Sequence, residues 1–141
     1  DSVVYLEGIS PDNQRMVSKS VAGEYCKMYC TSVGKAMLAN MPKEEVEKCI
    51  SGKLEAYTEN TITDKKSLLE EIEKTRIRGY GIDDMEIMFG IKCVGVALLN
   101  HDGKVEGGLS ISAPSLRMSD EKIELYANIL KEYAAKIQKM L

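Results

Sequence analysis

The chain has 141 residues, of which 44% are hydrophobic and 29% charged, and its net charge is −3. This size and balance fit one globular domain whose core needs no disulfide or metal. The slight negative charge argues against direct nucleic-acid binding, which uses a basic surface. The sequence has neither an apolar run of membrane-spanning length nor a signal-peptide pattern, so we expect a cytoplasmic protein without a membrane partner. Because the first residue is Asp1 rather than Met, we interpret the chain as part of a longer polypeptide.

The four cysteines suit a reducing compartment better than a disulfide framework. Cys26 and Cys30 are four residues apart, whereas zinc sites are usually built from two closely spaced ligand pairs. The single histidine, His101, lies far from them in the sequence. We therefore expect buried or half-buried free thiols, with structural zinc as the weaker alternative, and we expect no cofactor.

The N-terminal half of the sequence predicts two strands followed by three helices. β-Branched and aromatic residues mark the strands, and runs of helix formers bounded by Pro or Gly mark the helices. Asp64 is a suitable N-cap for the longest helix, and Gly79 is a suitable stop. The expected buried side of this helix consists of Leu68, Leu69, Ile72 and Thr75. The strands are expected over residues 3–7 and 15–21, and the helices over residues 34–39, 42–50 and 64–78.

The C-terminal half predicts a short strand, a hairpin and a last helix. The strand, over residues 80–82, leads into an acidic turn over residues 83–86, and the hairpin ends at Pro114. Ser119 is a candidate N-cap for the helix. Its apolar positions recur every three or four residues, which indicates a core-facing stripe rather than a seam for a partner helix, since the sheet needs a cover. They are Ile123, Ala127, Leu130, Ala134, Ile137 and Leu141. The element order predicts an α+β domain with a mainly antiparallel sheet flanked by helices.

The hairpin is the most informative segment, because Asp102–Gly103 between two alternating runs predicts a two-residue turn. That turn pairs His101 with Lys104, and the same count places Cys93 opposite Ser112. Side chains alternate between the two faces of a strand, so the register separates an apolar face from a face of small residues. The apolar face carries Val94, Val96, Leu98, Val105, Leu109 and Ile111. The other face carries Cys93, Gly95, Ala97, Gly108, Ser110 and Ser112, with Gly95 opposite Ser110. Small side chains let either a helix or a polar ligand approach the sheet.

The start of the helix near Gly34 is the first candidate binding site. Amides at a helix start lack partners within the helix and lie at the positive end of its dipole, so they favour an anion. Gly34 lacks a side chain that would block access to the amides of Ser32 and Val33. The alternative is that Thr31 or Ser32 caps the helix and Gly34 packs against a neighbour, and this segment by itself favours that alternative.

The acidic segment Asp83, Asp84 and Glu86 is the second candidate site. Three carboxylates within four residues suit a divalent cation, although such residues are more often solvated in turns. A third interpretation is that Asp83, at the end of a strand, accepts a hydrogen bond from a ligand hydroxyl.

The third candidate is the cluster of Cys93, Ser110 and Ser112 on one face of the hairpin. A catalytic thiol needs an activating base. His101 lies about eight residues away at roughly 3.3 Å per residue, so it is too distant to activate Cys93. We therefore expect a binding site rather than an enzyme.

Four segments together resemble the effector-binding domain of IclR-type transcriptional regulators, in the order and spacing of that family. They are residues 31–39 (TSVGKAMLA), 78–86 (RGYGIDDME), 90–95 (GIKCVG) and 109–114 (LSISAP). The resemblance implies a GAF-like α+β domain over residues 1–141. It also implies a dimer or tetramer, and a winged helix-turn-helix, absent from this chain, that binds DNA.

The resemblance further implies that the three candidates form one effector pocket. The amides of Ser32 and Val33, beside Gly34, would hold the carboxylate of a small organic acid. The polar wall would consist of Asp83, Cys93, Ser110 and Ser112. We thus expect an effector-binding and oligomerisation domain that couples metabolite binding to DNA binding. The alternatives are a ligand-free GAF-like assembly module and a metal-dependent sensor or hydrolase that uses the acidic segment and cysteines.

Overall fold

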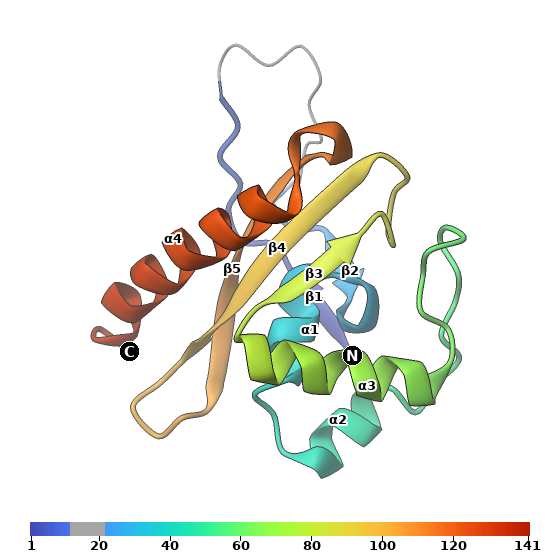
Figure 1. Ribbon diagram of the computed structural model, residues 1–141. Coiled ribbons are helices and arrows are strands. Elements are labelled where there is room, and N and C mark those ends of the chain that lie inside the picture. The colour runs from blue at the N-terminus through green and yellow to red at the C-terminus, as the bar shows by residue number, and fades with distance from the viewer. Residues whose placement is uncertain (12–21) are drawn as a thin grey trace.

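The computed structural model describes residues 1–11 and 22–141 and has the expected α+β fold (Figure 1). Strands β3, β4 and β5 form one antiparallel sheet, and β1 pairs with β2 in a second, smaller one. The strand expected over residues 15–21 lies outside the described residues. The elements are β1 (Ser2–Val4), β2 (Tyr25–Lys27), η1 (Met28–Cys30), α1 (Ser32–Leu38), α2 (Lys43–Cys49), α3 (Lys65–Arg78), β3 (Gly81–Asp84), β4 (Ile91–Leu99), β5 (Val105–Pro114), η2 (Ser115–Arg117) and α4 (Asp120–Gln138).

The main sheet has the predicted register through most of its length. Cys93 lies opposite Ser112 and Gly95 lies opposite Ser110, as the alternation predicts. β3 pairs with the start of β4 and reaches Asp84, which lies opposite Lys92. The prediction that the acidic turn begins at Asp83 is therefore wrong, because pairing with β4 extends β3 through Asp83 and Asp84.

The predicted two-residue turn at Asp102–Gly103 is wrong. Asn100, not His101, donates its backbone N–H to Lys104, at 2.9 Å, so the loop has three residues. Gly103 ends this loop with φ +75°, the left-handed conformation that glycine adopts readily. The pairing then shifts between Leu98 and Leu99, which leaves one extra residue in β5. This bulge cancels the one-residue error of the loop and restores the predicted register.

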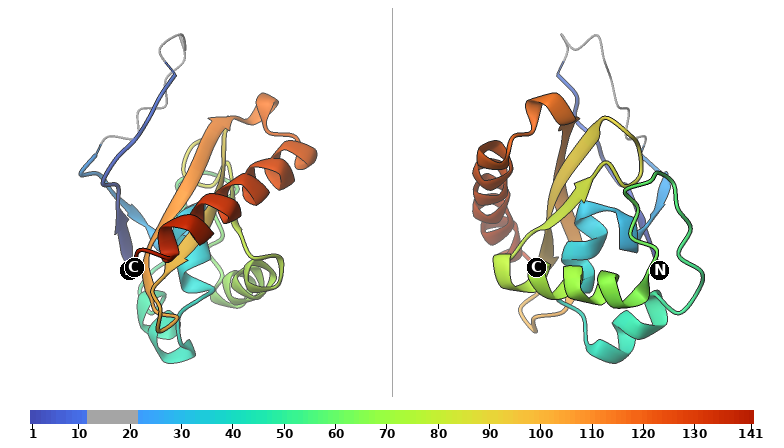
Figure 2. Two further views of the ribbon diagram at one scale, coloured as in Figure 1. Left: turned by 90° about the vertical axis from the view of Figure 1, so that its left-hand side faces the viewer. Right: turned by 45° about the vertical axis from the view of Figure 1, so that its right-hand side comes forward.

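One face of the sheet is covered by α4, as Figure 2 shows in its right-hand view. The periodic stripe on α4 is therefore part of the core. Two positions of the predicted stripe are outside this core: Ile137 is half-buried, and Leu141 is 47% exposed because the helix ends before it, at Gln138. Val105, predicted on the apolar face, is absent from the core between α4 and the sheet. The bulge places it opposite Leu99 and turns its side chain to the other face. The buried members are Val94, Val96, Met118, Ile123, Ala127, Leu130 and Ala134.

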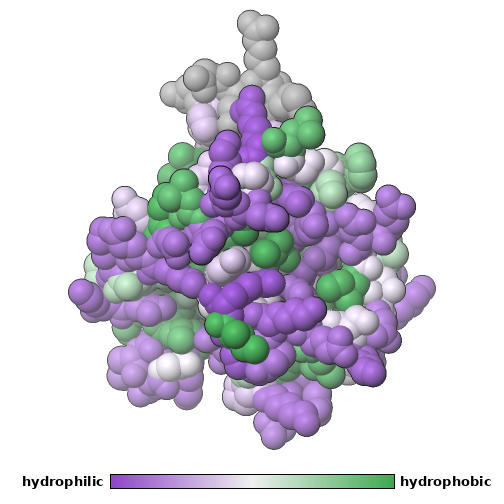
Figure 3. Space-filling model, in the orientation of Figure 1, coloured by the Kyte–Doolittle hydropathy of each residue, from purple (hydrophilic) through white to green (hydrophobic). Residues whose placement is uncertain are grey.

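The opposite face of the sheet packs against α1, with α2 and α3 beyond it (Figures 1 and 2). Asp64 caps α3 by accepting from the Ser67 N–H at 2.8 Å, and Gly79 ends it with φ +79°, as predicted. Leu69, expected on the buried side of α3, is 40% exposed. The face in Figure 3 is mainly hydrophilic with separate hydrophobic patches. Within the described residues, no helix is long and apolar enough to cross a membrane.

Candidate ligand-binding site

The candidate site lies on the α1 side of the sheet, where three strands bring polar side chains into line. Asp83 on β3 lies opposite Cys93 on β4, which lies opposite Ser112 on β5. We call these three residues the polar row. Ser110 and Gly95 occupy the next row along the strands. The structure thus brings together the four side chains that the sequence assigned to the polar wall.

Helix α1 approaches the sheet closely because glycines face it. A Cβ atom on Gly95 would lie 2.6 Å from the Val33 backbone nitrogen, and one on Gly108 would lie 2.3 Å from the Val33 Cγ2. Next to the polar row, therefore, the small-residue face accommodates a packed helix, which is one of the two alternatives that its composition allowed.

The start of α1 combines a capping residue with unpaired amides. The Thr31 hydroxyl accepts a hydrogen bond from the Gly34 N–H at 3.2 Å, so Thr31 is the N-cap. Among residues 1–11 and 22–141, no acceptor contacts the amides of Ser32 and Val33. Gly34 has a packing role: a Cβ there would lie 2.4 Å from the Met28 carbonyl oxygen. Of the two interpretations of Gly34, the contact with a neighbour is the one that the geometry supports.

The polar row holds a protonated thiol between a carboxyl group and a hydroxyl group. Ser112 Oγ donates to Cys93 Sγ at 3.0 Å. Burial and then the adjacent Asp83 raise the pKa of Cys93 to about 12, so the thiol is protonated at neutral pH and is a poor nucleophile. Asp83 is 4% exposed, and burial raises its pKa although the Glu86 N–H donates to Oδ1 at 2.7 Å. This chemistry suits hydrogen bonding to a ligand rather than covalent catalysis.

A buried ion pair adjoins Asp83 of the polar row, and the sequence does not predict it. Lys35 on α1 donates to the Ile82 carbonyl oxygen at 2.7 Å and forms an ion pair with Glu86. The Lys35 and Glu86 side chains are 1% and 6% exposed. The sequence treats Lys35 as an ordinary helix former and Glu86 as part of an acidic turn. The one signal for Lys35 is its place among apolar residues in a helix.

The three acidic residues do not form a metal site. Asp84 is exposed and pairs with Lys92 at 3.1 Å, whereas Asp83 and Glu86 are buried. In the part of the chain that the structure describes, no group of three or more His, Cys, Asp or Glu side chains is arranged to hold a metal ion. His101 is exposed in the hairpin loop, beside Asp102 and far along β4 from the polar row. The described residues therefore supply no set of ligands for the metal-dependent alternative.

The β1–β2 segment also reaches the polar row, through Tyr5 and Cys26. The sequence does not indicate this proximity. Burial raises the pKa of Tyr5, and the nearby Cys26, Cys93 and Asp83 raise it further. Both residues pack against the core on the α1 side of the sheet. Tyr5 therefore adds a protonated phenol to the groups around the polar row.

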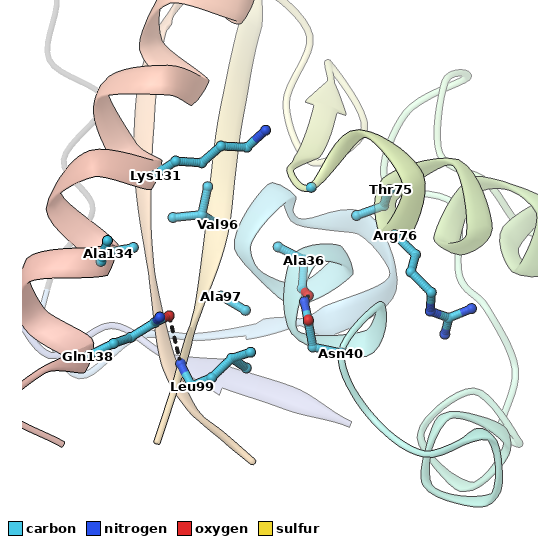
Figure 4. Close-up of a pocket in the computed structure, with 12 residues that line it drawn as sticks. Ala36, Asn40, Thr75, Arg76, Val96, Ala97, Leu99, Lys131, Ala134 and Gln138 are labelled. Carbon is cyan, nitrogen blue, oxygen red and sulfur yellow. Dashed lines mark hydrogen bonds between the residues drawn. The ribbon is translucent and has the colours of Figure 1, made fainter. Parts of the chain in front are cut away.

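Among the described residues, the two most clearly formed cavities lie away from the polar row. The larger, of about 220 Å³, opens between α1, α3, β4 and α4 at the far end of α1 from the polar row (Figure 4). Gln138 accepts from the Leu99 N–H at 3.0 Å on its wall, and Lys131 reaches across from α4 (Figure 4). The smaller, of about 170 Å³, lies beside α2 and is lined partly by Lys27, Lys48 and Lys53. Neither cavity is lined by the polar row.

Comparison with known families gives a match over residues 1–139 to the C-terminal domain of the bacterial transcriptional regulator IclR. The chain belongs to the IclR family. This membership confirms the resemblance seen in the four sequence segments. The matched IclR-family domain covers the whole α+β fold described above, including every residue of the candidate site.

Curated relatives of this IclR-family chain are transcription factors. It is 38% identical over 139 residues to the HTH-type transcriptional regulator KdgR of Escherichia coli K12, covering 97% of this chain and 52% of that protein. It is 34% identical over 106 residues to the transcriptional repressor IclR of the same organism, covering 74% and 39%. The chain thus spans about half the length of these relatives, or less. Both are named as regulators rather than enzymes, which agrees with the expectation from the sequence.

Solved structures of the IclR family share the fold. The crystal structure of Thermotoga maritima IclR superposes with a TM-score of 0.92 at 37% identity, covering 99% of this chain and 57% of that one. The C-terminal domain of E. coli KdgR superposes with a TM-score of 0.79 at 35% identity, covering 84% and 73%. These similarities establish the GAF-like α+β architecture of the chain.

Proposed function

We propose that this IclR-family domain binds a small organic acid at the polar row and the start of α1. The observation that carries the proposal is the alignment of Asp83, Cys93 and Ser112 across three strands, beside the unpaired amides of Ser32 and Val33. The amides suit the carboxylate of the acid, and the row together with Ser110 suits its hydroxyl or carbonyl oxygens. Gly34 contributes by allowing α1 to begin where it does.

We also propose that the domain acts within a longer regulator. A winged helix-turn-helix outside this chain would bind the DNA, and the effector domains would associate as a homodimer or homotetramer in the cytoplasm. A ligand that favours one arrangement of the domains would shift the affinity for DNA by linkage. A coupling free energy of about 1–3 kcal/mol corresponds to roughly 5–150-fold in affinity. The relatives that are transcriptional regulators support this role.

The binding proposal is tested with a panel of small acids, including pyruvate, lactate, gluconate and benzoate. A ligand that binds only the folded state raises its thermal stability, so at least one acid should raise the melting temperature. The double variant Asp83→Asn with Ser110→Ala should lose that rise. The matched control is Ser51→Ala, at an exposed serine after α2. If binding survives the double variant unchanged, the site is elsewhere.

A ligand-free assembly module is the second candidate function. The contact between α1 and the glycine face favours it, as does the position of both cavities away from the polar row. Sedimentation equilibrium separates the two candidates when it is combined with the acid panel. Oligomers that form while no acid has any effect would support the assembly module, whereas stabilisation by an acid that depends on Asp83 supports the sensor.

A further inference from the structure

Asp83 of the polar row belongs to a buried cluster of three ionisable side chains, together with Lys35 and Glu86. As whole residues, Lys35, Asp83 and Glu86 are each no more than 4% exposed. The cluster contains one ammonium group and two carboxyl groups. If both carboxyl groups were ionised, this buried region would carry one excess negative charge.

The contacts of Glu86 leave one of its oxygens without a partner. Oε1 pairs with the Lys35 ammonium group, while Oε2 is buried and has no hydrogen-bond partner among the described residues. The backbone of Glu86 is also held in place, because its N–H donates to Asp83 and its carbonyl oxygen accepts from Thr61 Oγ1 at 2.6 Å. Glu86 is therefore fixed in an interior position where burial opposes its ionisation and the Lys35 ammonium group favours it.

Among residues 1–11 and 22–141, the other titratable groups that face the cluster do not offset the excess charge. Cys30 on η1 faces it, and burial raises the pKa of this thiol to about 12. Burial likewise raises the pKa of Cys26 on β2, of Cys93 on β4 and of Tyr5 after β1, so these groups are neutral at physiological pH. On the neighbouring strands, Lys92 is paired with Asp84, and Lys27 is paired with Asp1.

This inference rests on the proposed function, since it concerns the acid bound at the polar row. A carboxylate bound at the buried amides of Ser32 and Val33, beside the polar row, would add a second excess negative charge to this region, which water screens little. We infer that the domain takes up one proton from solvent, onto the carboxyl group of Glu86, when an acid binds with its carboxylate at the start of α1 and its other oxygens at the polar row. The site thereby binds the anion and the proton together.

The direction of the pH effect follows from the environment of Glu86. Burial raises its pKa to about 7, against the lowering effect of Lys35. Below that pH the proton is already present and an anion binds without further uptake. Above it the proton is acquired on binding, so affinity for a carboxylate decreases with rising pH, by at most about tenfold per pH unit for one linked proton.

Calorimetric titration with pyruvate tests the inference on the whole 141-residue chain. Titrations at pH 8 in phosphate and in Tris, which differ in ionisation enthalpy, give the number of protons taken up. We expect a value close to one at pH 8 and close to zero at pH 5.5, with Kd weakening by nearly tenfold per pH unit above pH 7. Pyruvamide, the uncharged analogue, should show neither uptake nor pH dependence.

Two variants identify the proton carrier. Glu86→Gln is permanently neutral, so its pyruvate affinity should be independent of pH and exceed that of the wild type at pH 8.5. Glu71→Gln removes a different paired glutamate, the partner of Arg78 on α3, and should keep the wild-type pH dependence. If Glu86→Gln fails to fold, the wild-type proton count still decides the question. Pyruvate binding without proton uptake at pH 8 overturns this inference alone, whereas no binding at any pH overturns the proposed acid site as well.

Discussion

Glu86 combines a fixed position, an unpaired carboxyl oxygen and an ion pair with Lys35 in the interior of the domain. A charged pair of this kind is costly to bury, and breaking it by removing one partner is costlier still. Glu86 therefore affects the stability of the fold as well as any ligand chemistry.

Stability should decrease as pH rises from about 4.5 to about 7. The pKa of Glu86 is raised from its ordinary value of 4.5 to about 7, so in this window the folded state binds more protons than the unfolded state. Protonated Glu86 thus favours folding at the acidic end, and the advantage is lost through pH 7. The full effect is about 3 kcal/mol at most. Urea unfolding at pH 5 and pH 8 measures it, and Glu86→Gln should remove this part of the difference. An equal decrease in the variant would show that other groups cause it.

Sequence reasoning identified Cys93, Ser112 and Asp83 but not Lys35 and its pairing with Glu86. The first three follow from strand alternation and a hairpin, whose pairing is set by nearby residues. Lys35 and Glu86 are 51 residues apart and meet only when α1 docks on the sheet. No local pattern distinguishes a buried lysine in a helix from an exposed one.

At the scale of elements, the contact between α1 and the sheet sets the geometry of the site. The caps Thr31, Asp64 and Ser119 were all found among the candidates in the sequence, because capping depends on residues within one turn. The end of β3 was placed too early, because its extension depends on pairing with Lys92 in another strand. The hairpin loop is one residue longer than predicted. The sequence does not indicate this, because the bulge in β5 that compensates for the longer loop has no clear sequence pattern.

Gly95→Ala should destabilise the domain by about 1–3 kcal/mol, the usual cost of overpacking a core. The added methyl group would lie 2.6 Å from the Val33 backbone nitrogen, so α1 must move away from β4. Gly107→Ala is the matched control on β5, since a Cβ there has no atom within 4 Å. Urea unfolding of both variants measures the difference. Equal stabilities would mean that α1 is less closely packed than described.

At the scale of the whole molecule, the sheet separates two cores. The α4 side is apolar, while the α1 side also holds the charged cluster and the candidate site. The sequence predicted the α4 side well because its period is regular along one helix. It predicted the other side poorly because that side is assembled from short segments of β1, β2, η1, α1 and β3.

Leu130→Ala should destabilise the domain by about 2–5 kcal/mol, because it leaves a cavity between α4 and the sheet. Leu130 is 7% exposed, whereas Leu125 on the same helix is 54% exposed. Leu125→Ala should therefore cost much less, and chemical unfolding of the two variants gives the comparison. Similar losses would indicate that α4 also buries its outer side, as a partner-helix seam would require.

The bulge in β5 isolates the two serines from the tip of the hairpin. An irregularity already lies between the loop at residues 101–103 and the paired positions 110 and 112, and the strands beyond it keep their alignment. The tip is thus a suitable attachment point for a fluorescent or affinity label, placed by insertion between Asp102 and Gly103. Such a label would report on the domain from a distance without rotating Ser110 or Ser112 out of line.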